Sequence, residues 1–359
     1  MSGTPLRVAF AGLAHSHPYT DAANVRALGA EVVGVHDADT AAAGEFAARF
    51  GGAAVASVEE LAVLRPDLVI ATPRPGEVVP FLRVLGGGRA PVFVNKVIAA
   101  TTAQLAEVDR ALAASSVSVG TSSVLRFAPA LTALATSIRP VSVRPGSVRP
   151  GSIRPVEFDV LALRVHAQHD NAAFRRPSSD APVALSVAKT AAERQKVRRE
   201  PGAGPSDRSW QDDPRQGGGT AVTVGVHAWE MIDVLLPGAT LVSGSGWTRV
   251  RRGSNTVSED AAGIEGLLRV PGAQREVPVH VLVTGTPGPD AYTLEVVTAD
   301  GVRSLALDVD DANTELGFRG LTHALLDAAA RGATVASWTS ARAVVANTIH
   351  AAEISRGQA

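Results

Sequence analysis

The sequence predicts an α/β protein whose first part is a doubly wound parallel sheet and whose second part is an α+β domain with a mostly antiparallel open sheet. In the first third, short apolar runs alternate with helical patterns, which is typical of a parallel sheet flanked by helices. After Arg126 the apolar runs become longer and alternate with polar residues, which favours strands with one buried face. We therefore expect two domains, formed by residues 1–124 and 125–359.

The first βαβ unit is predicted near the amino terminus. Leu6–Ala11 and Glu31–Val35 have the apolar composition of buried strands. Pro18 suits the first turn of a helix and Gly29 suits its C-terminal end, so residues 18–28 are predicted to be helical.

The same rhythm continues through the rest of the first domain. A helix over Thr40–Phe50 is predicted to stop at the glycines that follow it, and Ser57 with Glu60 forms a capping box for another helix. Because crossovers between parallel strands are right-handed, an open doubly wound sheet of the Rossmann type is the simplest topology. Its further strands are predicted at Leu68–Ala71, Val92–Val94 and Val117–Val119.

The second domain is predicted from alternating runs and a final helix. The helix begins at Thr339 or Ser340, ends at Ile354, and is a candidate for packing back on the first domain. Alternation of polar and apolar residues predicts strands within 157–165, 262–270, 277–283 and 292–297.

Two stretches of the second domain do not have the pattern of a strand or a core helix. Residues 137–155 repeat a short pattern of proline and arginine, which predicts a surface loop. Residues 168–216 are polar and rich in proline and arginine, which predicts an irregular loop with one helix near residues 182–199.

The composition argues against several classes of partner. The chain has 359 residues and a formal net charge of -1, so no global field would attract nucleic acid or anionic lipid. It contains no cysteine, which excludes disulfides and thiolate nucleophiles. No apolar run approaches the roughly 18 residues of a membrane span, and the first residues lack an apolar signal region. We therefore expect a cytoplasmic protein that acts on a small molecule, without a nucleic-acid or membrane partner.

A candidate phosphate-binding loop follows the first predicted strand. Gly12 permits a tight turn, Ala14 is small enough to let the backbone approach a pyrophosphate, and the helix near Pro18 offers free amides and a positive dipole end. His17 stands where the usual G-x-G-x-x-G pattern has its third glycine, so either the helix sits farther out or the imidazole faces the ligand.

An acidic residue supports the same hypothesis. Asp37 lies just past the second strand, where a carboxylate can accept hydrogen bonds from the adenosine ribose. This spacing favours NAD over NADP, although Arg74 or Arg83 could approach a 2′-phosphate from elsewhere. The alternative is that Asp37 only caps the next turn.

His15 and His17 also suggest a metal site, because H-x-H at the end of a strand occurs in metal-dependent hydrolases. Such sites need further histidine and aspartate ligands at later strand ends, and here those ends carry Thr72, Pro73 and Asn95 instead. We therefore expect no metal, and a surface or phosphate-facing role for the two histidines.

Lys96 is the strongest candidate for chemistry in the first domain. The chain has only three lysines, and this one ends a buried strand, on the edge where open α/β sheets bind ligands. The alternative is a structural lysine whose ammonium group reaches solvent from the strand end.

Taken together, these motifs resemble those of the Gfo/Idh/MocA family, which includes glucose-fructose oxidoreductase and inositol 2-dehydrogenase, and the resemblance covers nearly the whole chain. It rests on Gly12, Asp37, Ala71–Pro73, Asn95–Val97, Arg126–Pro129, the glycines 217–219, and 225–230 with His227 and Glu230. The family pattern implies NAD or NADP as cofactor, a homodimer or homotetramer, and hydride transfer to or from a hydroxylated metabolite. The implied cofactor-binding residues are Gly12, Ala14, His15, His17, Asp37, Thr72, Pro73, Asn95 and Lys96.

The resemblance also assigns the catalytic residues. It implies that Lys96 contacts the nicotinamide ribose and the substrate hydroxyl, and that His227, at the start of a helix, is the acid-base residue. Asn95 and Val97 depart from the family's usual Glu-Lys-Pro pattern. The alternative for His227 is a helix-capping role, and Glu230 either orients it or faces solvent.

Thr223 is the most consequential departure. Many family members carry an aspartate there, and a hydroxyl supplies no charge to stabilise an imidazolium. Lys96, Arg126, Thr223 and His227 are the expected substrate contacts. Two other functions stay open, namely a dinucleotide-binding sensor or assembly subunit with little redox turnover, and an enzyme that uses transient oxidation for elimination or bond cleavage.

Overall fold

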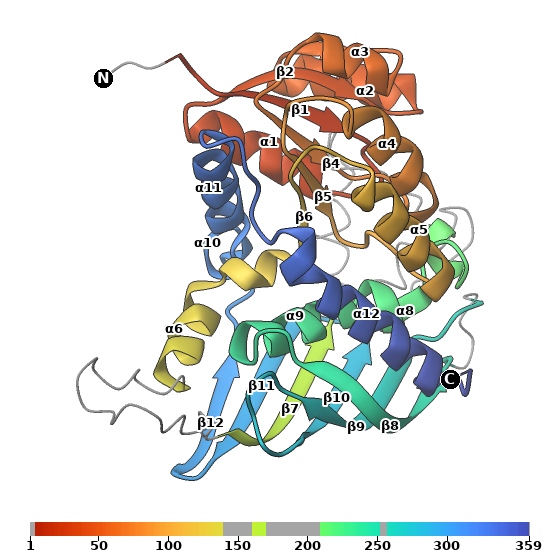
Figure 1. Cartoon of the computed structure of the whole chain (residues 1–359), viewed down its shortest axis with the longest axis vertical. Helices are drawn as coiled ribbons and strands as arrows, with labels where there is room; N and C mark the ends of the chain where they lie inside the picture. The colour runs from red at the N-terminus through yellow and green to blue at the C-terminus, as the bar shows by residue number, and fades with distance from the viewer. Residues whose placement is uncertain (1–3, 139–159, 170–208, 252–256, 359) are drawn as a thin grey trace.

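The computed structural model describes residues 4–138, 160–169, 209–251 and 257–358, and it contains two sheets with helices between and around them (Figure 1). The predicted helix at 182–199 and most of the repeat at 137–155 lie outside the described residues. Among the helices that are described, none combines the length and the apolar character needed to cross a membrane.

The first sheet confirms the predicted Rossmann-type topology. Its six strands are parallel and run in the order β3-β2-β1-β4-β5-β6. The last strand begins two residues later than predicted and continues to Ser122. Its carboxyl end was missed because the buried residues there, Thr121 and Ser122, are polar. The strands are β1 (Arg7–Ala11), β2 (Glu31–His36), β3 (Ala53–Ala54), β4 (Leu68–Ala71), β5 (Val92–Asn95) and β6 (Val119–Ser122).

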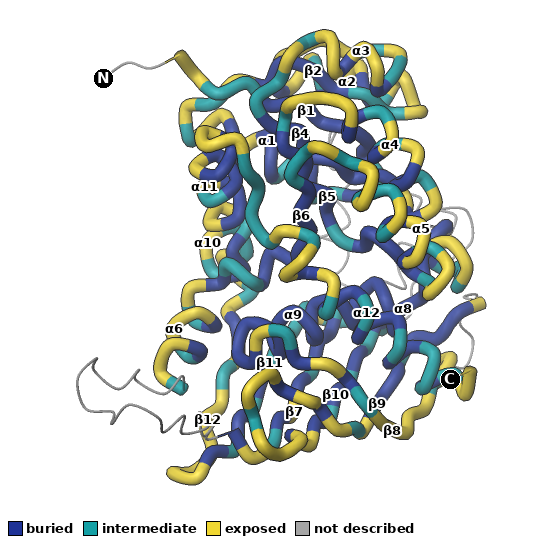
Figure 2. Tube along the Cα trace, in the orientation of Figure 1, coloured by how far each residue is buried: buried dark blue, intermediate teal, exposed yellow. Residues whose placement is uncertain are grey.

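Helices cover both faces of this sheet, and Figure 2 shows that the residues of its central strands are buried. Phe10 points into the core shared with α1 and α2, whereas Ala9 points into the core shared with α3, α4 and α5, because successive strand residues face opposite sides. The helices are α1 (His17–Ala27), α2 (Thr40–Phe50), α3 (Val58–Val63), α4 (Val78–Leu85) and α5 (Thr102–Ala113), with short 3₁₀ turns η1 (Pro75–Glu77) and η2 (Val124–Phe127).

The second sheet is mostly antiparallel, as predicted, in the order β12-β11-β7-β10-β9-β8, and only β7 and β10 pair in parallel. The two edge strands were not predicted, because most of their side chains are exposed and the apolar alternation is missing. The strands are β7 (Val160–Gln168), β8 (Thr240–Arg249), β9 (Ala261–Arg269), β10 (Val277–Thr284), β11 (Ala291–Thr298) and β12 (Gly301–Ala306).

Helices α9 (Gly225–Leu235) and α12 (Trp338–Ser355) lie between the two sheets (Figure 1). The final helix, predicted to within two residues at its start, contacts the first domain, where Trp338 Nε1 donates to Asp109 at 2.9 Å. The short helix α8 (Gly219–Thr223) precedes α9, and the 3₁₀ turn η4 (Ser209–Asp212) lies next to it.

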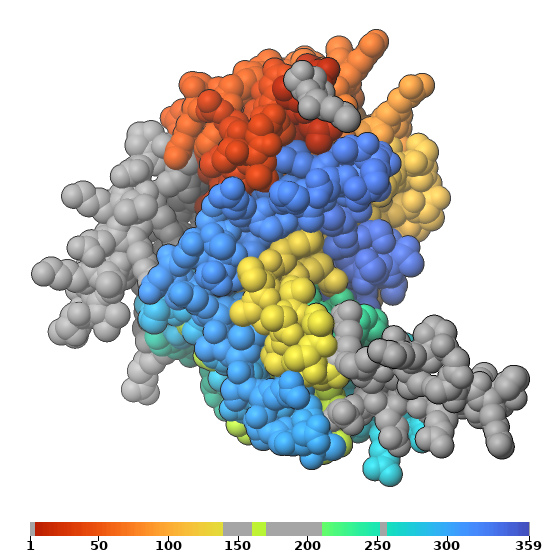
Figure 3. All heavy atoms as spheres, turned by 90° about the vertical axis from the view of Figure 1, so that its left-hand side faces the viewer, coloured from red at the N-terminus to blue at the C-terminus, as the bar shows by residue number. Residues whose placement is uncertain are grey.

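The remaining helices form one side of the molecule (Figure 3). Helix α6 (Pro129–Ile138) extends into the first residues of the predicted repeat loop, so Ser137 and Ile138 are helical and not part of a loop. Helix α11 (Phe318–Ala329) packs against α1 and follows α10 (Ala312–Glu315). The chain after the second sheet therefore returns to the first sheet, where α11 packs beside the helix that follows β1.

Candidate functional site

A glycine-dependent turn follows β1. Gly12 has a φ of +87°, a conformation that residues with a Cβ rarely adopt. A Cβ there would lie 2.8 Å from the carbonyl oxygen of Thr72 and 3.0 Å from the nitrogen of Pro73. The amide of Gly12 donates to His36 at 2.7 Å and that of Ala14 to Thr72 at 3.1 Å, so the loops after β1, β2 and β4 meet at this point.

Asp37 ties two of these loops together. Its Oδ2 accepts from the amide of Leu13 at 2.6 Å, and its Oδ1 accepts from the amide of Asp39 at 2.8 Å. The cap of α2 is Asp39, which accepts from Ala41 and Ala42. Asp37 thus turns the chain after β2, and its carboxylate lies beside the glycine turn.

The two histidines pack against each other at the start of α1. His15 is buried, and its Nδ1 accepts from the His17 amide at 3.2 Å. The His17 ring lies 4.5 Å from that of His15 and 4.9 Å from that of Phe318 on α11. Phe318 thus provides the packing for the imidazole that replaces the third glycine. Within the described residues, no cluster of three or more metal-ligating side chains exists.

A buried polar network lies at the ends of β4 and β5. Asn95 Nδ2 donates to Thr72 Oγ1 at 3.0 Å and to Asp21 Oδ2, on α1, at 3.1 Å. Burial raises the pKa of Asp21 to about 7, although the hydrogen bond from Asn95 lowers it. The sequence analysis did not identify Asp21, because the sequence of a helix alone does not show that this carboxyl is buried at the end of β5.

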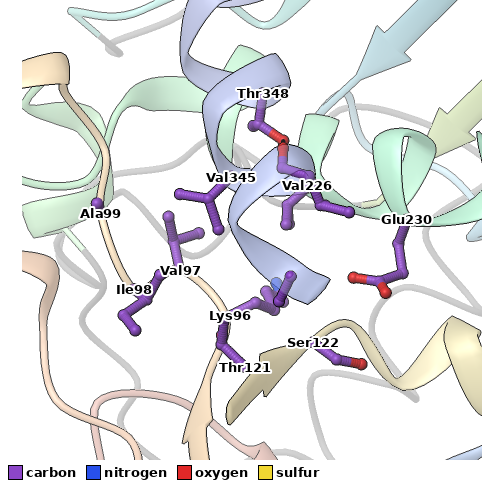
Figure 4. Close-up of a pocket in the computed structure, with 12 residues that line it drawn as sticks. Lys96, Val97, Ile98, Ala99, Thr121, Ser122, Val226, Glu230, Val345 and Thr348 are labelled. Atoms are coloured by element: carbon purple, nitrogen blue, oxygen red, sulfur yellow. Dashed lines mark hydrogen bonds between the residues drawn. The ribbon is translucent and has the colours of Figure 1, made fainter. Parts of the chain in front are cut away.

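Lys96 follows this network and points toward the second domain. Its Nζ donates to the carbonyl of Thr223 at 3.3 Å, and its own carbonyl lies 3.3 Å from His15 Nε2. The peptide bond between Lys96 and Val97 is cis. Figure 4 shows Lys96 beside the first turns of α12, across a small pocket from the carboxylate of Glu230.

His227 lies in the first turn of α9, which begins two residues earlier, at Gly225. Its Nδ1 is 2.6 Å from the Oγ of Ser123, at the end of the first sheet, and its ring is 5.5 Å from that of Tyr292. Burial, together with the positive charges of Lys96, His169 and His17, holds the pKa of His227 well below its usual value of 6.5.

Glu230 is linked to His227 through Ser123, which contacts both residues. One carboxylate oxygen accepts from the amide of Ser123 at 3.0 Å, and the other pairs with the guanidinium of Arg126. Arg126 also pairs with Asp233. The expected contact between Arg126 and substrate therefore has no support in the geometry, because two carboxylates occupy the guanidinium and the residue does not line the main cavity.

Thr223 faces the cavity with a hydroxyl that is already engaged. Its Oγ1 donates to the carbonyl of Gly219, one turn earlier in α8, at 2.7 Å. The oxygen still has acceptor capacity, but its hydrogen points into its own helix.

The principal cavity joins the two domains. It has a volume of about 300 Å³, and the predicted residues that line it are His15, His17, Lys96, Thr223 and His227. Those outside its lining are Gly12, Ala14, Asp37, Thr72, Pro73, Asn95 and Arg126.

The opposite wall of the cavity was missed by sequence reasoning. His169 Nδ1 lies 2.8 Å from Asp290 Oδ1, and both line the cavity with Tyr292, Trp210 and Gln211. His169 and Trp210 lie within residues 168–216, the stretch predicted to be an irregular loop, where no periodicity marks a functional residue.

Solved structures of known proteins share the fold of this chain, but their sequence identity to it is low. No protein-family model and no curated protein matches the chain. GenD2 from gentamicin A biosynthesis, solved in complex with NAD, superposes with a TM-score of 0.71 at 17% identity, over 99% of this chain and 95% of that one. The chain has the fold of this structure.

Two further structures extend the comparison. UDP-N-acetylglucosamine 3-dehydrogenase GnnA from Acidithiobacillus ferrooxidans has a TM-score of 0.67 at 13% identity, with 99% of each chain covered. A myo-inositol dehydrogenase from Corynebacterium glutamicum has a TM-score of 0.66 at 14% identity, covering 99% of this chain and 97% of that one. At the level of the fold, these likenesses agree with the resemblance predicted from the motifs.

Proposed function

We propose that this protein is an NAD-dependent oxidoreductase that transfers hydride between nicotinamide and a secondary alcohol or ketone of a sugar, a cyclitol or a related metabolite. The observation that carries the proposal is the meeting of Lys96, from the Rossmann-type sheet, with His227, from the second domain, in one cavity of about 300 Å³. A volume of this size suits a small polar ring.

The residues of the first domain fit a dinucleotide. The turn at Gly12 has no room for a side chain, Asp37 lies beside it, and the positive end of the α1 dipole, which has no side-chain cap, favours an anion at the same place. The negative charge of Asp37 disfavours a 2′-phosphate, which supports NAD over NADP. When bound, the cofactor would supply or accept the hydride.

The second domain offers groups suited to a hydroxylated substrate. Trp210 and Tyr292 give apolar ring faces, and Gln211 with the His169–Asp290 pair offers hydrogen bonds on the same wall. Facing them, Lys96 would polarise the reacting oxygen and His227 would act on its proton.

Binding and turnover test this proposal separately. NADH fluorescence should report binding at micromolar protein, and absorbance at the nicotinamide band should report turnover over a panel of polyols and keto sugars. Lys96→Ala should cut turnover by at least about a hundredfold while NADH binding persists, because the lysine acts on the substrate oxygen. Near-normal turnover of this variant would overturn the role of Lys96.

A second function is favoured by one specific observation. The Thr223 hydroxyl donates to its own helix, and among the described residues no carboxylate makes a hydrogen bond with His227, so the chain could bind dinucleotide as a sensor or assembly subunit with little redox turnover. Tight NADH binding without absorbance change across the whole panel would support this second function. Transient oxidation leading to elimination would instead give a new product with no net change in NADH. A homodimer or homotetramer and a cytoplasmic location remain predictions.

A further inference from the structure

The hydrogen bonds around Ser123 determine which nitrogen of His227 carries its hydrogen. Ser123 is fully buried, and its Oγ accepts from the amide of Leu125 at 3.2 Å. A buried hydroxyl also needs an acceptor for its own hydrogen. Among the described residues, the only acceptor within hydrogen-bond distance of this Oγ is Nδ1 of His227, at 2.6 Å.

We propose that Ser123 holds His227 as the neutral tautomer with its hydrogen on Nε2, so that the cavity presents two hydrogen-bond donors, Lys96 and His227, and is preset to reduce a ketone. This inference rests on the proposed function and deepens it, and it reassigns one role: Lys96 supplies the proton, and His227 donates a hydrogen bond in place of acting on the proton. The opposite tautomer would place a hydrogen on Nδ1 and leave the Ser123 hydroxyl hydrogen buried without an acceptor, at a cost typical of a lost buried hydrogen bond.

The charges around the imidazole support the neutral form. Lys96, His169 and His17 all disfavour a second proton on the ring, and burial acts in the same direction. The nearest carboxylate on the same helix, Glu230, is turned away to Arg126 and the Ser123 amide. Asp290 is paired with His169 across the cavity.

The chemistry follows from the two donors. Nδ1 is held by Ser123, so Nε2–H is the ring group left for a ligand in the cavity. In the reductive direction, reduced nicotinamide dinucleotide would supply the hydride to the carbonyl carbon, with both electrons of the new C–H bond. The carbonyl oxygen takes a proton from the Lys96 ammonium, which becomes an amine. His227 donates a hydrogen bond to that oxygen and keeps its hydrogen, as neutral imidazoles do when they polarise a carbonyl.

The tautomer can be measured directly and without any substrate. Long-range ¹H–¹⁵N correlation spectra of protein labelled with ¹⁵N-histidine distinguish the Nε2–H, Nδ1–H and imidazolium forms, and His227→Gln identifies the signals. We expect His227 to be the neutral Nε2–H form from pH 6 to pH 9. Detection of the Nδ1–H form or of an imidazolium at pH 7 would overturn the inference, whether or not the protein turns over any substrate.

Two serine variants test the cause. Ser123→Ala removes the hydroxyl that donates to Nδ1, and we expect a mixture of the two neutral tautomers. Ser122→Ala is the matched control, because it removes a buried hydroxyl one residue earlier that donates to the Ser123 carbonyl at 2.5 Å and does not contact the imidazole. This control should keep the Nε2–H form. A tautomer unchanged in both variants would overturn the role of Ser123.

Kinetics separate this inference from the function on which it rests. If a ketone substrate is found, Ser123→Ala should lower kcat for reduction by at least about tenfold, since loss of the correct tautomer in a catalytic histidine costs up to about 10⁴-fold. The effect should fall on kcat rather than KM. If no substrate is turned over, the proposed function fails, while the spectra still decide the tautomer.

Discussion

Asn95, the residue before Lys96, donates its side-chain amide to the carboxyl of Asp21 on α1 at 3.1 Å. The other oxygen of Asp21 and the side-chain oxygen of Asn95 have no hydrogen-bond partner among the described residues. The strand that presents Lys96 is thus held against α1 by a fully buried acid. In the Glu-Lys-Pro pattern that this sequence resembles, a glutamate at the end of the strand carries the carboxyl, and this chain has Asn95 at that position.

Asp21 should make the stability of the protein depend on pH. Burial raises its pKa from the ordinary value of 3.8 to about 7 in the folded protein, so the folded state binds the extra proton between these two pH values. The free energy of unfolding should therefore fall as pH rises from about 4 to about 7, by up to roughly 4 kcal/mol. Asp21→Asn, which imitates the protonated acid, should remove this loss and be the more stable protein at pH 8.

Urea unfolding of both proteins between pH 4 and pH 8 checks this expectation. Asp109→Asn is the control of opposite sign, because hydrogen bonds from Arg342 lower the pKa of Asp109 in the folded protein. The advantage of wild type over that variant should be present at neutral pH and disappear in acid. Equal pH slopes for wild type and Asp21→Asn would show that Asp21 is ionised at no measurable cost.

Gly12→Ala should abolish dinucleotide binding by displacing the loop. The new Cβ would clash with the Thr72 backbone and would also need a φ of +87°. Gly29→Ala is a matched control, because Gly29 has a φ of +83° but open space around its Cβ. We expect the control to lose about 1 kcal/mol of stability and to bind NADH normally. The measurement is NADH titration alongside thermal unfolding, and equal affinities for the two variants would contradict the role of the turn.

The sequence predicted the elements whose signals are local. Helix α2 has the predicted bounds, because a capping aspartate and two glycines delimit it. The two edge strands were missed, since their exposed residues carry no apolar alternation. The candidate site divides in the same way. Lys96 directly follows a strand and His227 lies in the first turn of a helix, and a sequence motif marks each position.

The residues that position these two groups could not be predicted in this way. Ser123 and His227 are 104 residues apart in the chain, and Asp21 and Asn95 are 74 apart. Each pair is set by how the elements pack. A serine after a strand and an aspartate in a helix have many ordinary roles, so neither stands out before the fold is known. The partners of Arg126 could not be predicted for the same reason, because its two carboxylate partners lie 104 and 107 residues later in the chain.

Asp37→Ala should weaken NADH binding by about tenfold and leave NADPH binding less affected, because the carboxylate would accept hydrogen bonds from the ribose and repel a 2′-phosphate. Asp39→Ala is the control. It removes the cap of α2, which costs about 1 kcal/mol, without changing a group near the ribose. Titration of each variant with both dinucleotides gives the preference. A change of the same size in the two variants would mean that Asp37 acts only through the fold of the loop.

Arg126→Met should destabilise the protein strongly at neutral pH, because it leaves the carboxylates of Glu230 and Asp233 buried without their cation. Breaking a buried ion pair from one side costs about 3–5 kcal/mol. Burial already raises the pKa of Glu230, against the effect of Arg126, so without the arginine this carboxyl should take up a proton readily.

The loss caused by Arg126→Met should therefore be smaller at pH 5 than at pH 8. Arg342→Met provides the comparison, because Arg342 is exposed, its partner Asp109 is only half-buried, and surface pairs contribute about 1 kcal/mol or less. Chemical unfolding at both pH values measures the two effects. If Arg126→Met cost no more than the surface variant, Glu230 would keep its position and its contact with Ser123 without the arginine. Because the amide of Ser123 donates to Glu230 and its hydroxyl to His227, the histidine signals of Arg126→Met should then match those of wild type.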